Sequence, residues 1–347
     1  MGTEESSLQP ANPNQQSTMQ TTHMLFVAVS VGFMAFFFTS DCDMALYVLP
    51  FSNTSKTFNG KVVWVTGASS GIGASLAKDF TVRGAEVIVS ARRVAELEAI
   101  AKECTALGAK SVKVLPLDVL DHTAQQAAYD QIISEFGHVD TLVLNPGRTQ
   151  RALALDTTIE STRALFDLNF LSFVSLAKIV IPDMLKRGGG SITVISSISG
   201  KMGTPVSSTY SATKYALHGY FDAVRAEYAH RGLHVLMVCP GPVVSEIAGH
   251  AVKGEGMEDK VYETEDSVKM STARCTHLIM KALHYKFDEV WLSTQPFLFI
   301  TYLSVYTPGL CRFLFKHVFG PARVKAFQSD GNVFDVMAAL RSLVSSK

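Results

Sequence analysis

Residues 61–80 read KVVWVTGASSGIGASLAKDF, an apolar β-branched run followed by a glycine-rich turn and a helical stretch. Glycines in such a turn let backbone N–H groups approach a pyrophosphate, and the helix N-terminus adds partial positive charge. The position of the turn, between a first strand and a first helix, distinguishes a dinucleotide site from an ordinary tight turn. We therefore expect a dinucleotide to be bound by Gly67, Ser69, Ser70, Gly71, Ile72 and Gly73.

Short apolar runs alternate with longer helical stretches along the chain that follows. Most of the runs are apolar throughout, which is typical of strands buried on both faces of a parallel sheet. The alternation predicts an α/β fold, in which one domain over residues 58–293 is built on a doubly wound, parallel, seven-stranded Rossmann sheet. The seven expected strands read VVWVT, EVIVSA, VKVLPLD, VDTLVLN, SITVIS, LHVLMVC and EVWLS.

The two ends of the chain differ from this pattern. Residues 1–23 are polar and contain no Lys or Arg, which predicts a disordered tail. Residues 24–51 are mostly apolar and predict a hydrophobic membrane anchor that either spans the bilayer or lies in its interface, with a helix buried against the domain as the alternative. Residues 294–347 form a hydrophobic C-terminal extension in which Pro308 excludes a continuous helix. We interpret it as an interfacial element or a cover on the substrate mouth, with a dimer contact as the alternative.

Composition excludes several classes of function. Lys and Arg together number 31, as do Asp and Glu, so the 347-residue chain has no net charge that would attract nucleic acid. The five cysteines lie far apart, with no CxxC motif or Cys/His cluster. The sequence therefore predicts neither a metal site nor a disulfide framework.

The end of the second expected strand indicates which dinucleotide is bound. Ala91 stands where an NAD site would have a carboxylate for the ribose 2′-hydroxyl, and Arg92 and Arg93 follow it. An arginine at this place receives a 2′-phosphate instead. The sequence thus favours NADP(H) as the cofactor.

A second group of residues is suited to proton transfer. Tyr210 and Lys214, in the stretch YSATK, share one helix face at i, i+4 spacing. A phenol, with its pKa near ~10, is a poor proton donor or acceptor at neutral pH, and a neighbouring ammonium lowers that pKa. Ser196 and Ser197 end the strand SITVIS, at the sheet edge where ligands bind, and their hydroxyls could polarise a carbonyl group.

From Lys61 to about Leu292, the motifs TGASSGIG, YSATK and CPGPV resemble those of the short-chain dehydrogenase/reductase family. The resemblance implies that Ser197 orients a carbonyl, that Tyr210 donates the proton, that Lys214 lowers the Tyr210 pKa and holds the nicotinamide ribose, and that Asn169 keeps a water in the proton relay. Where the family usually reads NNAG, the chain has Leu144-Asn145-Pro146-Gly147, and proline removes one backbone donor beside the cofactor. Further cofactor contacts implied by the resemblance are Asp118, Val119, Asn145, Tyr210, Lys214, Pro240, Gly241, Val243 and Ser245.

The likeness extends to membrane-associated members of the family that act on lipophilic carbonyl compounds at the endoplasmic reticulum. It implies an NADP(H)-dependent oxidoreductase that reduces carbonyls, or oxidises alcohols, of lipophilic substrates such as steroids or retinoids. The expected partners are the substrate, a lipid bilayer and a second copy in a homodimer, and no metal is needed. Two alternatives stay open: a long-chain keto-lipid reductase, and an NADP-binding membrane scaffold with little turnover.

Overall fold

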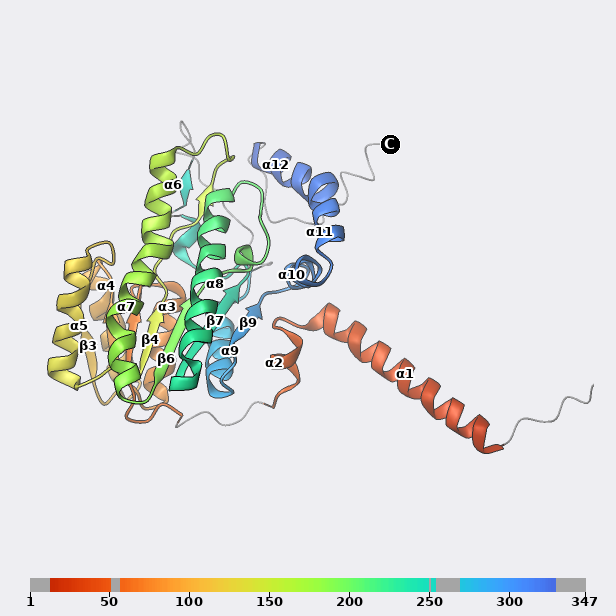
Figure 1. The fold of residues 1–347 in the computed structure, drawn as a ribbon, viewed down its shortest axis with the longest axis horizontal. Helices are drawn as coiled ribbons and strands as arrows, with labels where there is room; N and C mark the ends of the chain where they lie inside the picture. The colour runs from red at the N-terminus through yellow and green to blue at the C-terminus, as the bar shows by residue number, and fades with distance from the viewer. Residues whose placement is uncertain (1–12, 51–56, 250, 254–268, 329–347) are drawn as a thin grey trace, which may run out of the picture. The chain divides into compact units, whose positions relative to one another are not determined.

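The computed structural model describes residues 13–50, 57–249, 251–253 and 269–328 (Figure 1). The chain divides into two compact units, Met1–Ser40 and Asp41–Lys347. The second unit contains a sheet of seven parallel strands in the order β3-β2-β1-β4-β6-β7-β9. These strands match the seven expected runs and confirm the doubly wound fold. They are β1 (Val62–Thr66), β2 (Glu86–Ser90), β3 (Val112–Val114), β4 (Thr141–Leu144), β6 (Gly190–Ile195), β7 (Leu233–Pro240) and β9 (Glu289–Leu292).

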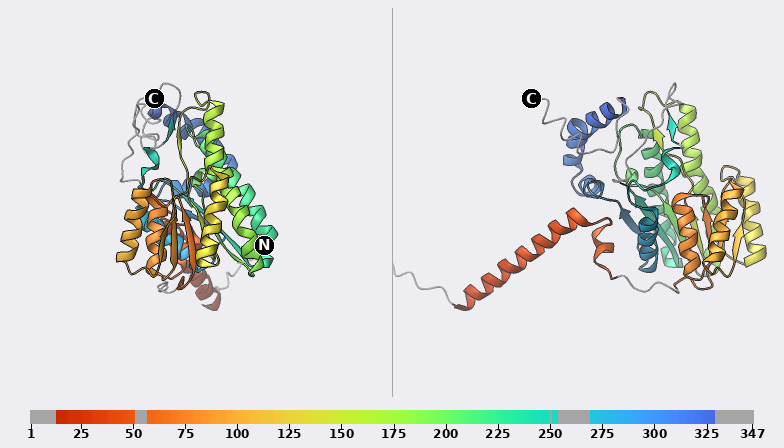
Figure 2. Two further views of the ribbon diagram at one scale, coloured as in Figure 1. Left: turned by 90° about the vertical axis from the view of Figure 1, so that its left-hand side faces the viewer. Right: turned by 180° about the vertical axis from the view of Figure 1, so that it is seen from behind.

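Helices cover both faces of this sheet, as Figures 1 and 2 show. Alternate residues of each strand enter separate cores, so that Val63 and Val65 pack on one side and Val62 and Trp64 on the other. Burial on both faces explains why the strands are apolar throughout. One layer holds α3 (Gly71–Val82), α4 (Val94–Ala106) and α9 (Thr272–His284), and the other holds α5 (His122–Phe136), α7 (Ser172–Lys186) and α8 (Ser208–Tyr228).

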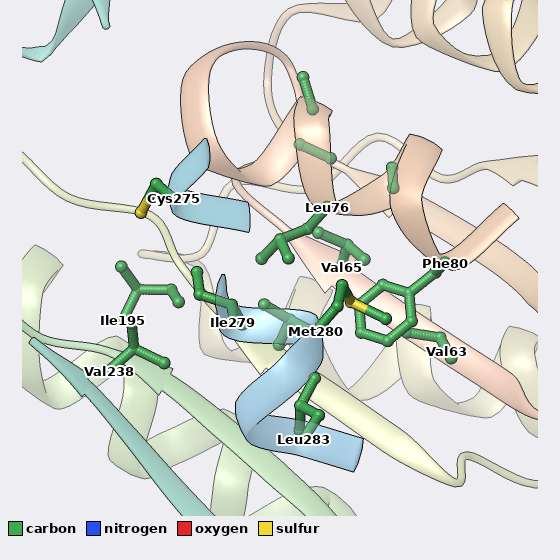
Figure 3. Close-up of a cluster of buried hydrophobic side chains, with 14 of the residues drawn as sticks. Val63, Val65, Leu76, Phe80, Ile195, Val238, Cys275, Ile279, Met280 and Leu283 are labelled. Carbon is green, nitrogen blue, oxygen red and sulfur yellow. The ribbon is translucent and has the colours of Figure 1, made fainter. Parts of the chain in front are cut away.

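The contact between α3 and α9 shows how these layers are stabilised. Leu76 and Phe80 of α3 lie against Ile279 and Met280 of α9, above Val65 of the sheet (Figure 3). Leu76, Phe80, Ile279 and Val65 are all fully buried, and each such side chain contributes about 1.5–3 kcal/mol relative to an exposed one. This packing holds the N-terminus of α3, which follows the glycine turn, firmly at the edge of the sheet.

Most of the remaining elements lie at the carboxyl edge of the sheet, whereas the 3-10 turn Ala229–Arg231 directly precedes β7 at the opposite edge. Two very short strands, absent from the sequence-based expectation, form a second parallel sheet. Helix α6 runs through a π-helical turn into α7. Pro308 occupies the start of a new helix, as expected from its inability to continue the preceding one. These elements are β5 (Gln150–Arg151), β8 (Val252–Lys253), α6 (Ile159–Phe166), the π-turns Asp167–Leu171 and Phe315–Phe319, the 3-10 turns Ile198–Gly200, Ala229–Arg231 and Glu246–Ala248, α10 (Phe297–Tyr306), α11 (Pro308–Leu314) and α12 (Gly320–Gln328).

The N-terminal unit is largely one helix, α1 (Pro13–Thr39). The predicted disordered tail over residues 1–23 is therefore wrong from residue 13 onward, and residues 1–12 lie outside the described part. Once an apolar segment forms a helix, polar residues before it extend the helix at little cost, and proline suits its first turn.

The apolar stretch Thr21–Phe36 of this helix is shorter than a typical membrane span. Among the described helices, Ile159–Lys186 alone is long and apolar enough to cross a membrane. Its residues Phe173, Leu176 and Val180 are fully buried in the core on one face of the sheet.

Residues 41–49 belong to the folded domain, so the predicted anchor ends too late. Helix α2 (Met44–Val48) is capped by the Asp43 carboxylate, which also accepts a hydrogen bond from the Trp291 N–H at 2.9 Å. Leu46 is fully buried, and the Lys281 Nζ donates to the carbonyl oxygens of Leu46 and Leu49, at 2.7 Å each. The apolar stretch MALYV is therefore joined to the domain through Leu46, while Tyr47 and Val48 remain exposed. Its last predicted residue, Phe51, lies outside the described residues.

Candidate active site

A cavity of about 480 Å³ opens at the carboxyl edge of the sheet. Its wall combines the glycine turn, the ends of β4, β6 and β7, the start of α8, and parts of the C-terminal extension. The structure thus brings the predicted dinucleotide residues and the predicted proton-transfer residues into one site. Of all site residues expected from the sequence, only Gly73 and Asn169 do not line this cavity.

The conformation and close contacts of the turn require glycine at two of its positions. Gly67 has a φ of +64°, and a Cβ added to it would lie 2.8 Å from the backbone nitrogen of Pro146. A Cβ on Gly73 would lie 2.3 Å from the Gly67 oxygen. The Asn145 Nδ2 donates to that same oxygen at 2.9 Å, so the unusual proline packs on the turn while Asn145 holds it.

Arg93 connects this turn to the end of β2. Its Nη2 donates to the hydroxyls of Ser70 at 2.9 Å and Ser69 at 3.2 Å. The same nitrogen lies 3.1 Å from a carboxylate oxygen of Glu246. Arg93 and Arg92 both line the cavity beside Ala91, where no carboxylate stands. The wall of the cavity therefore brings two arginines and two serines together at the glycine turn.

Tyr210 and Ser197 both line the cavity and are hydrogen-bonded to each other. Ser197 lies at the end of β6, where its Oγ accepts the N–H of Ser199 at 3.1 Å and donates to the Pro240 oxygen at 3.2 Å. Burial raises the pKa of Tyr210, while the Ser197 hydrogen bond and the charge of Arg151 act in the opposite direction. The phenol is therefore protonated at neutral pH and can act as a proton donor.

Lys214 lies one helical turn beyond Tyr210 and is only 3% exposed. Its Nζ donates to the Ile195 oxygen at 2.9 Å and lies 5.7 Å from the centroid of the Tyr210 ring. Burial lowers the pKa of Lys214 to about 7. Ser197 and Arg151 are the groups that lower the pKa of Tyr210 against the effect of burial, and the expected effect of Lys214 on this pKa stays a prediction.

Asn169 lies within the π-helical turn between α6 and α7, a deviation that often marks functional sites. Its side chain exchanges two hydrogen bonds with the backbone of Arg148, both at 2.9 Å. A Cβ added to Gly147 would lie 3.1 Å from the Asn169 Oδ1 and 3.9 Å from the Lys214 Nζ. Gly147 therefore leaves space between this amide and the ammonium of Lys214.

A buried cluster behind Ser196 was not expected from the sequence, because its members come from α8, β7 and β9. The His218 Nε2 lies 3.1 Å from the Ser196 Oγ, and Cys239 is 3.6 Å from the same nitrogen. Burial opposes ionisation of Glu289, but hydrogen bonds from His218, Lys201 and Trp291 lower its pKa to about 2. Because the Glu289 oxygens are already engaged by these donors, the cluster is a hydrogen-bond network that supports the end of β6.

The cavity residues that the sequence did not predict include Arg151 of β5, Phe297 of α10 and Arg323 of α12. No sequence motif marks any of them. Phe297 and Arg323 place part of the C-terminal extension in the cavity wall, which agrees with one of the three roles considered for it.

Comparisons with known proteins agree with this geometry. A family model described as "short chain dehydrogenase" matches residues 61–256. The chain is 41% identical over 272 residues to the Homo sapiens protein "Dehydrogenase/reductase SDR family member 7", covering 77% of this chain and 80% of the relative. The Mus musculus protein of the same name is 38% identical over 78% of this chain and 80% of its own.

Solved structures share the fold. A short-chain dehydrogenase from Streptomyces avermitilis superposes with a TM-score of 0.64 at 29% identity, over 74% of this chain and 95% of that one. An alcohol dehydrogenase from Thermococcus sibiricus, complexed with 5-hydroxy-NADP, superposes with a TM-score of 0.61 at 22% identity. The superposition covers 68% of this chain and 97% of that one. The second likeness shows the fold alone.

Proposed function

Because the chain belongs to the short-chain dehydrogenase family of oxidoreductases, we propose that it is an NADP(H)-dependent reductase of carbonyl groups on lipophilic molecules, able to oxidise the corresponding alcohols in reverse. The observation that carries this proposal is the meeting of Ser197, Tyr210 and Lys214 with the glycine turn in one cavity. A phenol, a hydroxyl and an amine in this arrangement are suited to protonating a carbonyl oxygen.

The cavity fits a nicotinamide dinucleotide. Side chains at Gly67 and Gly73 would fill the turn that a pyrophosphate approaches, and both positions lack them. Asp118 and Val119 would contact the adenine end, and Asn145, Lys214, Pro240, Gly241, Val243 and Ser245 the nicotinamide end. When bound, the cofactor supplies a hydride to the carbonyl carbon or accepts one from the alcohol.

The chain's own residues would handle the oxygen and the proton. The Ser197 hydroxyl would orient the carbonyl oxygen, and the Tyr210 phenol, protonated at neutral pH, would donate its proton to that oxygen. Lys214 and Asn169 would return a proton to Tyr210 through the space beside Gly147. No metal ion is required in this scheme.

The preference for NADP(H) is supported by Ala91 and by the contacts of Arg93 with Ser69 and Ser70. We expect Arg93→Gln to raise the KM for NADPH about 10- to 100-fold, since a hydrogen bond to a charged group contributes about 1.5–3 kcal/mol. The KM for NADH should change little, because NADH lacks the 2′-phosphate. Steady-state kinetics with both cofactors measures this.

The matched control is Arg163→Gln, which removes an exposed arginine of α6 outside the cavity and should leave both constants unchanged. Equal losses for NADPH and NADH in the Arg93 variant would contradict a 2′-phosphate contact.

A lipophilic substrate is supported by the apolar part of the cavity wall, which includes Leu168, Ile198, Met202, Ile247 and Phe297. Steroids and retinoids are the proposed substrates, and a long-chain keto lipid is the alternative from the same class.

Membrane association, proposed to be at the endoplasmic reticulum, is supported by two exposed apolar regions. In α1, Met24 is 75% and Leu25 65% exposed, and in α10 and α11, Tyr306 is 71% and Phe313 59% exposed. Exposed apolar side chains gathered on helices are typical of membrane or protein contacts. A homodimer contact through α10 and α11 remains the competing proposal for that region.

The function is tested by incubating the detergent-solubilised full chain with NADPH and a steroid ketone, a retinal or a long-chain keto lipid. We expect NADPH consumption with at least one of the three, and the preferred compound identifies the substrate class. If NADPH binds, as followed by its fluorescence, but no carbonyl compound is consumed, the protein is instead an NADP-binding scaffold.

A further inference from the structure

His218 is a buried residue that the proposed reaction does not use. It lies on α8, one helical turn beyond Lys214. Its Nε2 lies 3.1 Å from the Ser196 Oγ, at the end of β6. On the other side of the ring, Nδ1 lies 3.3 Å from the Glu289 Oε2. His218 therefore joins a carboxylate of β9 to the serine that directly precedes Ser197.

Glu289 fixes the orientation of the His218 ring. The Lys201 Nζ lies 2.7 Å from its Oε2, and the Trp291 Nε1 donates to its Oε1 at 2.6 Å. Burial opposes its ionisation, yet these contacts and the one with His218 lower the pKa of Glu289 to about 2. Because a carboxylate only accepts hydrogen bonds, the ring turns an N–H of Nδ1 toward it and leaves Nε2 for the Ser196 hydroxyl.

The residues on either side of Ser196 both contact the groups that transfer the proton. Before it, the Ile195 oxygen accepts a hydrogen bond from the Lys214 Nζ at 2.9 Å. After it, the Ser197 hydroxyl is hydrogen-bonded to Tyr210. A displacement of Ser196 would therefore move the partner of the amine and the partner of the phenol together.

The imidazole of His218 has little room to turn. A Cβ added to Gly200, in the 3-10 turn after β6, would lie 2.8 Å from the His218 Cδ2 and 2.9 Å from its Nε2. The Cys239 Sγ lies 3.6 Å from the same nitrogen. The contact with Ser196 is therefore fixed by the shape of the surroundings as well as by Glu289.

Other roles for the same cluster agree less well with these contacts. Cys239 and Glu289 face different nitrogens of the His218 ring, and an ammonium group already lies beside Glu289, so the cluster does not suit a cation. Ser196 is only 3% exposed, which argues against its direct attack on a substrate. The cluster is better suited to holding the end of β6 in place.

We propose that His218, oriented by Glu289, is a positioning residue for carbonyl reduction, because it holds the segment that places the Ser197 hydroxyl and the Lys214 amine. The inference rests on the proposed reductase function, to which it adds a residue that does not line the cavity. Such a residue can affect the rate strongly, since a misplacement of about 1 Å at a reacting group can lower a rate about 10²-fold.

The kinetic test compares two replacements of His218. His218→Leu removes the acceptor for Ser196, and we expect it to lower kcat about 10- to 100-fold while the KM for the carbonyl compound changes little. His218→Gln places an amide near the position of Nε2 and should retain most of kcat. Both variants lack Nδ1, so their difference isolates the bond to Ser196. His230→Leu, an exposed histidine outside the cavity, is the control and should change neither constant.

A double-mutant cycle tests whether Ser196 and His218 act through one bond. Ser196→Ala removes the same hydrogen bond from its other side and should lower kcat by a similar factor. Combined with His218→Leu, it should add little further loss, because both changes break a single interaction. Losses that multiply in the double variant would contradict the proposal.

A further measurement does not depend on turnover. NMR of the full chain, with its tyrosines labelled at Cζ, reports the hydrogen bond between Tyr210 and Ser197, and the signal is assigned by its absence in Tyr210→Phe. We expect this signal to shift in His218→Leu and to stay close to that of the wild type in His218→Gln. A ring that merely fills space would give the same signal in both variants.

The outcomes separate this proposal from the reductase function. If a carbonyl compound is reduced and His218→Leu turns over as fast as the wild type, or His218→Gln is impaired as much as His218→Leu, the positioning role is overturned while the reductase function stands. If no carbonyl compound is reduced, but the Tyr210 signal shifts in the leucine variant alone, the reductase function fails and the placement of Ser197 by His218 stands.

Discussion

Replacing Tyr210 by phenylalanine is expected to lower kcat for carbonyl reduction by about 10²- to 10⁴-fold, the usual contribution of a positioned general acid. The phenol hydroxyl is hydrogen-bonded to Ser197, and its pKa is raised by burial, so it is a protonated group beside the hydroxyl that is proposed to orient the carbonyl oxygen. Phenylalanine keeps the ring, and with it the shape of the cavity wall. NADPH consumption at saturating substrate measures the loss.

The control for this variant is Tyr215→Phe, on the same helix. Tyr215 is 46% exposed and does not line the cavity, so its hydroxyl should be dispensable for turnover. Fluorescence titration should show that Tyr210→Phe still binds NADPH with nearly the affinity of the wild type. Turnover by Tyr210→Phe close to that of the wild type would remove the phenol from its proposed role.

The sheet could be predicted because its strands have an unambiguous pattern. Strands buried on both faces are apolar throughout, and helices of ordinary length separate them. The strands β5 and β8 have two residues each and leave no such pattern. Their importance, namely that β5 carries Arg151 into the cavity wall, appears only in three dimensions.

The end of the anchor shows the limit of hydropathy. The stretch MALYV has the composition expected of a lipid-facing segment, but its Leu46 is fully buried in the domain, while Tyr47 and Val48 are exposed. Its polar partner is distant in sequence: the Lys281 Nζ donates to the Leu46 oxygen at 2.7 Å, from 235 positions away. A composition window cannot distinguish a protein core from lipid, because both reward apolar side chains equally.

The site residues also differ in whether a local sequence pattern marks them. Gly67, Tyr210 and Lys214 could be predicted because each belongs to a local motif whose spacing fixes the geometry. Arg323 follows the region that the family model matches and reaches the cavity only because α12 folds back next to Pro205. The direction of the Tyr210 pKa was also inaccessible, since it depends on burial and on Arg151, and i, i+4 spacing reports neither.

Because Lys214 is buried, we expect its replacement to lower the activity and to raise the stability of the protein. Lys214→Met should lower kcat by two orders of magnitude or more, about the factor given by acid–base assistance, because the amine beside Tyr210 is lost. At pH 6 to 7, however, the variant should have a higher Tm than wild type. Removing a buried ammonium from apolar surroundings relieves a desolvation cost on the order of a few kcal/mol. The variant also loses the hydrogen bond to the Ile195 oxygen, which costs about 1 kcal/mol, so the net effect is stabilising.

The pH dependence of this stability difference follows from the lowered pKa of Lys214. The pKa is about 7 in the folded protein and 10.5 in the unfolded chain. Below pH 7 both states carry the charge, so the full cost acts against the folded wild type. Between pH 7 and 10.5 the unfolded state binds more protons, so the stability of the wild type rises with pH relative to the variant. Above pH 10.5 neither state is charged and the cost is gone.

Calorimetric Tm values of both proteins between pH 6 and 10 measure this, with Lys178→Met as the control. Lys178 is an exposed lysine of α7, and its replacement should give a Tm difference that does not vary with pH in this way. If Lys214→Met were less stable than wild type at pH 6.5, or if the gap stayed constant up to pH 10, the ammonium would not be desolvated. Lys214 would then be charged throughout the neutral range, and the proton returned to Tyr210 would have to come from a fully ionised amine.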